Sequence, residues 1–156
     1  MRDQFTPEGI ELDHALGFRV YRLSQLFRTA LYRAFQAEGH DMTPEQWVVL
    51  VRLWQHDGAT QSELVESTLK DKATLSRILD VMERHELVVR RLDPVDGRSR
   101  RVHLTRTGKG LRSRFTPIVR AMVAKIEAEI PEAELEITRR TMLRLETNLL
   151  RLRDEA

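Results

Sequence analysis

The sequence contains no cysteine among its 156 residues. This absence excludes disulfide bonds, thiolate zinc sites and redox sensing through cysteine. The chain also has no apolar run near the roughly 18 residues of a membrane span, and its first residues lack the basic-then-apolar order of a secretion signal. We therefore expect a cytoplasmic protein with no membrane partner, whose hydrophobic residues (41%) form a core without covalent cross-links.

Motifs that carry enzyme chemistry are also missing. There is no glycine-rich phosphate loop, nucleophile elbow or HExxH sequence. None of the five histidines has a carboxylate four residues away, as a helical metal site would require; they are His14, His40, His56, His85 and His103. A metal site built from separate helices is the alternative. We expect no enzyme activity, no cofactor and no metal.

Positive charge is concentrated in one stretch. Residues 84–114 contain ten Arg or Lys and three acids, a charge of +7, while the other 16 basic and 21 acidic residues give −5. A basic block on an otherwise acidic chain is typical of a surface that binds a polyanion such as nucleic acid. A solvated charged face is the alternative.

Apolar residues at three- and four-residue steps predict a long amphipathic helix over about 10–38, ended by Gly39. Two capping-box sequences, Thr43-Pro-Glu-Gln46 and Thr60-Gln-Ser-Glu63, predict the starts of two more helices. Asp71 is expected to cap a third. Long helices are also predicted from Thr105 to about Glu129 and over about 132–153.

Between these helices the pattern changes to two β-rich runs, Leu87–Leu92 and Arg101–Thr105, joined by a basic loop that contains Asp93-Pro-Val-Asp-Gly97. The expected fold is mainly α with a small β-hairpin wing (α+β). It is a winged helix-turn-helix over 43–105 within a single domain, 1–156. Long N- and C-terminal helices, over 10–38 and 106–153, form a separate dimerisation lobe.

The helix over 71–84 buries one stripe and points short polar and basic side chains outward. Such side chains suit base edges and phosphates in a major groove, and arginine in a wing suits an adjacent minor groove. Arg90 and Arg91 alternate on a strand, so one of them at most faces DNA and the other is expected to form an ion pair. The candidate DNA-binding residues are Lys72, Thr74, Ser76, Arg77, Asp96, Arg98, Arg100 and Arg101.

The order of motifs resembles the multiple antibiotic resistance regulator (MarR) family. The resemblance is carried by Thr43-Pro-Glu-Gln-Trp47, Leu75-Ser-Arg-Ile-Leu-Asp80, Leu87-Val-x-Arg90, Asp93-Pro-x-Asp-Gly-Arg-Ser99 and Leu104-Thr-x-x-Gly108. It implies a homodimer with interlocked terminal helices, a wing arginine (Arg98) oriented by Asp96, and release from DNA by small aromatic or phenolic ligands. Glu86 departs from the family, which commonly has glycine there.

Two further sets of residues are hypotheses. Apolar residues of the terminal helices are expected to form the dimer interface; they are Leu16, Leu135, Met142, Leu145, Leu149 and Leu152. An effector pocket between the two lobes would be lined by Phe18, Tyr21, Arg22, Trp47 and Phe115, which offer aromatic walls and one cation for an aromatic acid. The alternative is that all of these except Arg22 simply pack the lobes together.

The sequence therefore predicts a transcriptional regulator that binds a pseudo-palindromic DNA operator, as a homodimeric repressor released by a small aromatic ligand. A DNA-binding accessory or architectural factor without an effector is the alternative. A protein-interaction module that has lost DNA binding is a third class, which the intact basic wing argues against.

Overall fold

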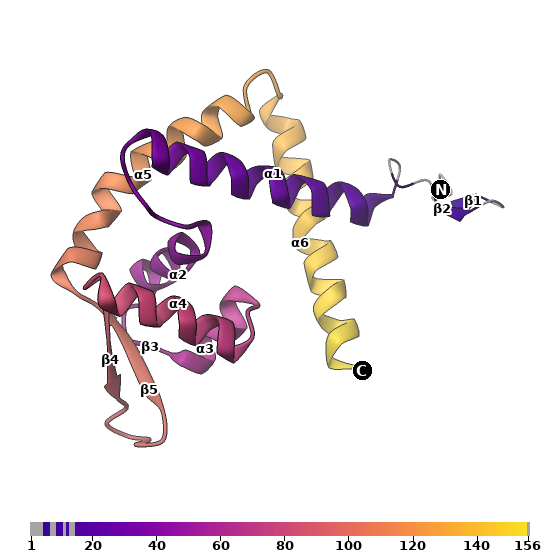
Figure 1. The fold of residues 1–156 in the computed structure, drawn as a ribbon. Helices are drawn as coiled ribbons and strands as arrows, with labels where there is room; N and C mark the ends of the chain where they lie inside the picture. Colours follow the sequence, from indigo (N-terminus) through magenta and orange to yellow (C-terminus); the bar gives the residue numbers. More distant parts are fainter. Residues whose placement is uncertain (1–4, 7–8, 11, 13–14, 156) are drawn as a thin grey trace. The chain divides into compact units, whose positions relative to one another are not determined.

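The computed structural model describes residues 5–6, 9–10, 12 and 15–155 (Figure 1). The chain divides into two compact units, residues 1–119 and 120–156, and each is described by itself. In chain order the elements are β1 (Phe5–Thr6), β2 (Gly9–Ile10), α1 (Leu16–Ala37), α2 (Pro44–Gln55), β3 (Ala59–Thr60), α3 (Gln61–Thr68), α4 (Lys72–Arg84), β4 (Val88–Leu92), β5 (Arg100–Leu104), α5 (Arg106–Ile126) and α6 (Glu132–Asp154). This mainly helical chain with a small antiparallel sheet is the winged-helix fold that the sequence predicts.

The predicted helix starts are confirmed for α2, α3 and α4. The Thr43 hydroxyl accepts from the Gln46 amide (3.2 Å) and the Gln46 side chain accepts from the Thr43 amide (3.0 Å). Thr60 and Glu63 form the same reciprocal pair at α3. At α4 the Asp71 carboxylate accepts from a backbone amide (2.8 Å). Each cap supplies an acceptor for an amide that the helix leaves unpaired.

The predicted start of the first helix at residue 10 is wrong. Ile10 lies in strand β2 and pairs with Phe5 of β1, and α1 begins only at Leu16. Gly39, just after this helix, has φ +73°, the left-handed conformation of a helix-ending glycine.

The small sheet has the strand order β3-β5-β4, and all its pairs are antiparallel. The wing hairpin pairs Val88 with Leu104 at its base and Leu92 with Arg100 at its outer end. Strand β3 was not predicted, because two residues carry no readable alternation; it is defined by pairing of Ala59 with Val102. The sheet therefore fixes the base of the wing on both sides of β5.

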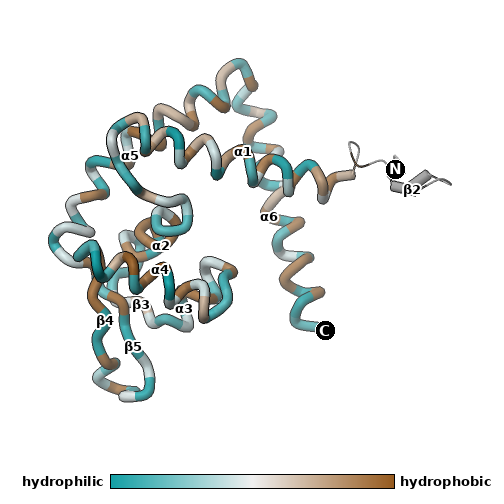
Figure 2. Tube along the Cα trace, viewed as in Figure 1, coloured by the Kyte–Doolittle hydropathy of each residue, from teal (hydrophilic) through white to brown (hydrophobic). Residues whose placement is uncertain are grey.

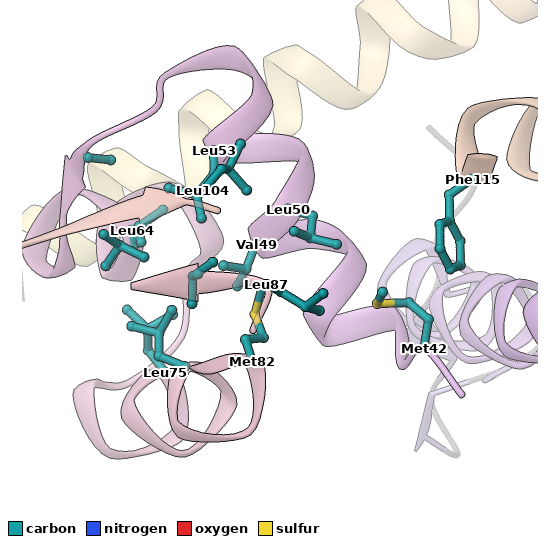
Figure 3. Packing of buried hydrophobic residues seen from close by; sticks show 14 of the residues in the cluster. Met42, Val49, Leu50, Leu53, Leu64, Leu75, Met82, Leu87, Leu104 and Phe115 are labelled. Carbon is teal, nitrogen blue, oxygen red and sulfur yellow. The ribbon is translucent and has the colours of Figure 1, made fainter. Parts of the chain in front are cut away.

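One hydrophobic core joins α2, α3, α4, the sheet, the end of α1 and the first part of α5 (Figure 3). Leu50, Leu53, Leu75, Leu79 and Met82 are completely buried in it. Aromatic rings extend the core toward α1 and α5, where Phe35 lies 4.9 Å from Phe115 and 5.7 Å from Trp47, centroid to centroid. The compact unit thus continues past residue 105, where the dimerisation lobe was expected to begin, to Val119.

The turn after α4 has the left-handed conformation that the sequence left open. Glu86 has φ +54°, and the Leu87 amide donates to the Met82 carbonyl at 2.9 Å. This is a common helix ending, but the residue in the left-handed position is usually glycine. A non-glycine residue there costs on the order of 1 kcal/mol.

Helix α6 has a different character in its own unit. None of its residues is buried, and apolar positions recur along its length (Figure 2). Near its start, Arg139 pairs with Glu132 (2.8 Å) and with Glu127 (3.4 Å). No helix in the described ranges is both long enough and apolar enough to cross a bilayer.

Candidate nucleic-acid interface

Helix α4 presents a polar face because its apolar stripe is fully used by the core. Leu75, Leu79 and Met82 are buried, whereas Lys72 and Arg77 are exposed. Among the described residues neither Lys72 nor Arg77 forms an ion pair. Their charges are therefore available to an anionic partner.

Two other predicted contact residues of α4, Thr74 and Ser76, are half-buried. The Thr74 hydroxyl donates to Asp71 at 2.7 Å, and this bond together with the Thr74 amide lowers the pKa of the exposed Asp71 carboxyl. The Thr74 hydroxyl thus gives its proton to the helix cap, and its methyl group and the lone pairs of its oxygen remain for a ligand.

The wing loop between β4 and β5 is organised by two aspartates. The Asp93 carboxylate accepts from the Val95 amide (2.8 Å) and the Asp96 amide (3.2 Å), and these bonds lower the pKa of Asp93. The Asp96 carboxylate accepts from the backbone amide of Arg98 at 3.0 Å. Asp96 therefore positions the backbone of Arg98 and leaves its exposed guanidinium to point elsewhere.

Arg90 connects the wing to α4. Its guanidinium donates to Glu83 (2.9 and 2.6 Å) and to Asp80 (2.5 Å), and its amide donates to Glu83 at 2.8 Å. The hydrogen bonds from Arg90 lower the pKa of Glu83. The prediction that one of Arg90 and Arg91 forms an ion pair is confirmed, and Arg91 is the exposed neighbour.

Arg101 also has carboxylate and carbonyl partners. Its Nε lies 2.6 Å from Asp93 Oδ2, and its Nη1 donates to the Gly58 carbonyl at 3.0 Å. Arg101 was predicted to contact DNA, but in the structure two of its five N–H donors bind partners within the protein. Arg98 and Arg100, by contrast, are exposed and take part in no ion pair within the part of the chain that the structure describes.

A hollow of about 300 Å³ lies between α3, the start of α4 and the wing, and we call it the α3–wing hollow. Three of the unpaired cations, Lys72, Arg98 and Arg100, line it. Its other lining residues are Gln61, Ser62, Val65, Leu75 and Ser99. Sequence reasoning missed Gln61, Ser62 and Ser99, because only the fold brings the first turn of α3 next to the wing.

The five residues proposed for an effector pocket do not come together within one chain. Trp47 and Phe115 lie in the aromatic cluster around Phe35, at the end of α1. Phe18 stands near the start of the same 22-residue helix, which at about 1.5 Å per residue is roughly 25 Å from Phe35 along the axis. Tyr21 (61% exposed) and Arg22 lie near Phe18 on the exposed part of α1. The prediction that these five residues line one pocket is therefore wrong for a single chain.

The residues predicted to form a dimer interface are mainly exposed in the single chain. Leu16 is 45% exposed and Leu149 and Leu152 are more than half exposed, whereas Leu135 and Leu145 are half-buried. Met142, also in the predicted set, is 37% exposed. Further exposed apolar side chains lie on the same helices; they are Val20, Leu23, Leu26, Phe27, Ile137 and Leu143.

Comparison with known proteins gives consistent results. The MarR family model matches residues 42–99. The transcriptional regulator HosA of Escherichia coli O111:H- is 32% identical over 126 residues, which cover 78% of this chain and 93% of HosA. The chain belongs to the MarR family. Another relative, the HTH-type transcriptional repressor NicR of Pseudomonas putida, is 32% identical over 77% of this chain and 79% of its own length.

Solved structures agree with this membership in the MarR family. A probable transcriptional regulator from Pseudomonas aeruginosa matches with a TM-score of 0.79 and 27% identity, over 86% of this chain and 99% of that one. As a MarR-family member the chain is a DNA-binding transcriptional regulator and not an enzyme. Within the winged-helix fold, α4 is the third helix of the helical part and the β4–β5 hairpin is the wing.

Proposed function

We propose that this MarR-family regulator binds a specific duplex with α4 in the major groove and the wing in the adjacent minor groove. The observation that carries the proposal is the sorting of the basic residues. Arg90 and Arg101 are held by carboxylates, while Lys72, Arg77, Arg98 and Arg100 extend from α4 and the wing with no acidic partner within the described residues. Unpaired cations on a helix and a hairpin that suit the two grooves favour DNA as the ligand.

Within this interface we assign the α3–wing hollow to a backbone phosphate. Lys72, Arg98 and Arg100 supply positive charge, and Gln61, Ser62 and Ser99 supply neutral donors. A phosphate here would lie between the strand segments that α4 and the wing contact. Phosphate contacts of this kind fix the register of a protein on DNA, while base contacts, here assigned to Ser76 and Arg77, set the sequence. Thr74 stays in the candidate set through its methyl group, and Asp96 through its hold on the Arg98 backbone.

We further propose that the regulator is a homodimer. An isolated chain would expose most apolar side chains in the first part of α1 and would bury none on α6, which leaves more apolar surface uncovered than single soluble chains commonly do. A second copy with the same helices would cover them, and a two-fold pair would bind a pseudo-palindrome whose half-site centres lie about 10 base pairs apart. Leu16, Leu145, Leu149 and Leu152 are assigned to this interface.

Repression, release by an effector and action in the cytoplasm complete the proposal. NicR, the relative described as a repressor, supports repression. An aromatic acid remains the proposed effector, but its site is not the five-residue pocket within one chain. The same finding favours the second candidate function, an accessory DNA-binding factor that no small molecule regulates. Titration of small aromatic acids against the DNA complex separates the two: a compound that lowers operator affinity supports the effector.

The test of DNA reading starts by selecting bound duplexes from a random pool with the full-length protein. We expect an enriched pseudo-palindrome, and we expect Arg98→Ala to lose affinity mainly at A·T-rich flanks, where a narrow minor groove favours arginine. Arg52→Ala, which removes the same charge from an exposed position on α2, is the control and should change affinity much less. Failure to enrich any sequence, or an Arg98→Ala protein with wild-type affinity, would contradict the proposed DNA interface of α4 and the wing.

A further inference from the structure

The wing loop is held in one shape from its inner end. The Asp93 side chain is only 5% exposed, and its two carboxylate oxygens have different partners. Oδ1 accepts from the amides of Val95 and Asp96, and Oδ2 lies 2.6 Å from Arg101 Nε. The backbone closes the same loop, because the Asp93 amide donates to the Ser99 carbonyl at 3.0 Å. A single carboxylate thus connects the start, the tip and the end of the wing loop.

The other end of this chain of contacts is the third strand of the sheet. Arg101 Nη1 donates to the Gly58 carbonyl (3.0 Å), and the Gly58 amide donates to the Val102 carbonyl (3.0 Å). Gly58 has φ +85°, and a Cβ there would lie 2.8 Å from the His103 ring. The guanidinium of Arg101 therefore binds a turn whose backbone conformation is one that glycine readily adopts. The His103 ring occupies the space that a side chain at position 58 would need.

We propose that Asp93 and Arg101 are positioning residues for DNA binding: they hold the wing loop in the shape that presents Arg98 and Arg100, and Arg101 does not neutralise a phosphate. The inference rests on the proposed DNA interface and adds to it. A preorganised loop loses less conformational freedom on binding than a flexible one, so its affinity is higher for the same contacts. Asp96, whose carboxylate accepts from the Arg98 amide, has a smaller part in this arrangement.

Salt dependence distinguishes positioning from phosphate contact. Each phosphate that a cation neutralises adds about 0.9 to the slope of log K against log salt concentration on duplex DNA. We expect Asp93→Ala and Arg101→Ala to lower operator affinity at least tenfold while leaving this slope at the wild-type value. Arg100→Ala is the matched control: it removes the same charge from the neighbouring exposed residue, and its slope should fall by about 0.9.

Two further variants test whether guanidinium geometry is needed and whether Asp93 and Arg101 act together. Arg101→Lys retains the charge but lacks the guanidinium geometry that reaches both Asp93 and Gly58, so it should lose affinity nearly as much as Arg101→Ala. The double variant Asp93→Ala/Arg101→Ala should cost hardly more than either single change, because the two residues act as one unit. Thermal unfolding of each variant, with protection of the Val95 and Asp96 amides from hydrogen exchange, separates a loosened wing from an unfolded protein.

The outcomes divide clearly. A slope for Arg101→Ala that falls by about 0.9, or full affinity of Asp93→Ala, would overturn the positioning role. Restored affinity in Arg101→Lys would do the same, because it would show that charge alone is needed. If Arg98→Ala and Arg100→Ala also bind with wild-type affinity and slope, the proposed DNA interface itself fails, which is a different result from failure of Asp93 and Arg101 alone.

Discussion

Two pairs of neighbouring arginines on the wing strands show how strongly the surroundings of a residue decide its role. Arg90 and Arg101 each lie against carboxylates, while Arg91 and Arg100 are exposed. Strand alternation predicted the split between Arg90 and Arg91. It did not reveal which one is paired, because the partners Asp80 and Glu83 come from α4 and are placed by the fold.

The same limit explains why the ion pair of Arg101 was not predicted from the sequence. In the sequence Arg101 follows Arg100 at the start of the second β-rich run, and nothing local indicates an ion-pair partner for it. Its partner Asp93 belongs to a turn sequence, Asp-Pro-Val-Asp, in which aspartate side chains commonly accept from amides two residues later. That signal was present for the hydrogen bond to Val95, but the ion pair across the hairpin required the observed register.

A prediction at this scale concerns Arg77, the proposed base contact on α4. Arg77→Ala should weaken binding to the selected operator by about 1–3 kcal/mol and relax the preference at one base position. Arg84→Ala is the control, since Arg84 is exposed in the last turn of the same helix. Base-by-base competition binding measures both effects. An Arg77→Ala protein that loses affinity equally on all sequences would make Arg77 a phosphate contact instead.

At the scale of elements, capping residues made most of the fold predictable. Thr43, Thr60 and Asp71 each begin a helix as their local sequence indicates. The start of α1 was misplaced because the apolar spacing continues upstream without a cap to end it. Strand β3 was missed because it exists only through pairing with β5.

The junction of the wing with α5 depends on close approach. A Cβ on Gly108 would lie 2.1 Å from the Leu87 carbonyl oxygen, and the Gly108 carbonyl accepts from Trp54 Nε1 at 3.0 Å. Gly108→Ala should therefore lower the free energy of unfolding by about 1–3 kcal/mol. Gly110→Ala, two residues later with open space around it, should raise it by about 0.5–1 kcal/mol. Denaturant unfolding measures both, and equal effects of the two changes would refute the role of close approach.

The connection between α4 and the wing should make stability depend on pH. Arg90 lowers the pKa of Glu83 below its ordinary value of 4.5, so the bond stabilises the fold above about pH 4.5 and its contribution is lost as the pH falls through the lowered pKa. Glu83→Gln should cost about 1 kcal/mol of unfolding free energy near neutral pH. The difference from wild type should shrink below pH 4.5. A difference that stays constant with pH would exclude the ionised pair as its source.

At the scale of the whole molecule, the terminal helices account for what a single chain leaves exposed. Leucines recur along α6, yet none of its side chains is buried. The sequence predicted this apolar surface from the spacing of the leucines. It did not locate an effector site within one chain, because the 22-residue helix α1 places Phe18, Tyr21 and Arg22 far from Trp47 and Phe115, which lie around Phe35 at its other end.

The dimer has its own test. Leu149→Glu with Leu152→Glu places two charges on the apolar surface of α6, where both leucines are more than 60% exposed. In a monomer these changes would be nearly neutral, whereas in a dimer interface two buried charges would be costly. Sedimentation should show the wild type as a dimer and the variant as a monomer. Arg151→Glu together with Arg153→Glu is the control, and a variant that stays dimeric would exclude this part of α6 from the interface.

DNA cleavage from a tethered reagent tests the central assignment most directly. Because the chain has no cysteine, Val95→Cys at the wing tip (94% exposed) and Ile137→Cys on α6 (53% exposed) each offer one attachment site for an iron chelate. With the full-length protein on its selected operator, we predict that the label at position 95 cuts the minor groove at two places, symmetric about the centre of the site. The label at position 137 should cut weakly or not at all. Uniform cleavage from position 95, or stronger cleavage from position 137, would contradict the placement of the wing on DNA.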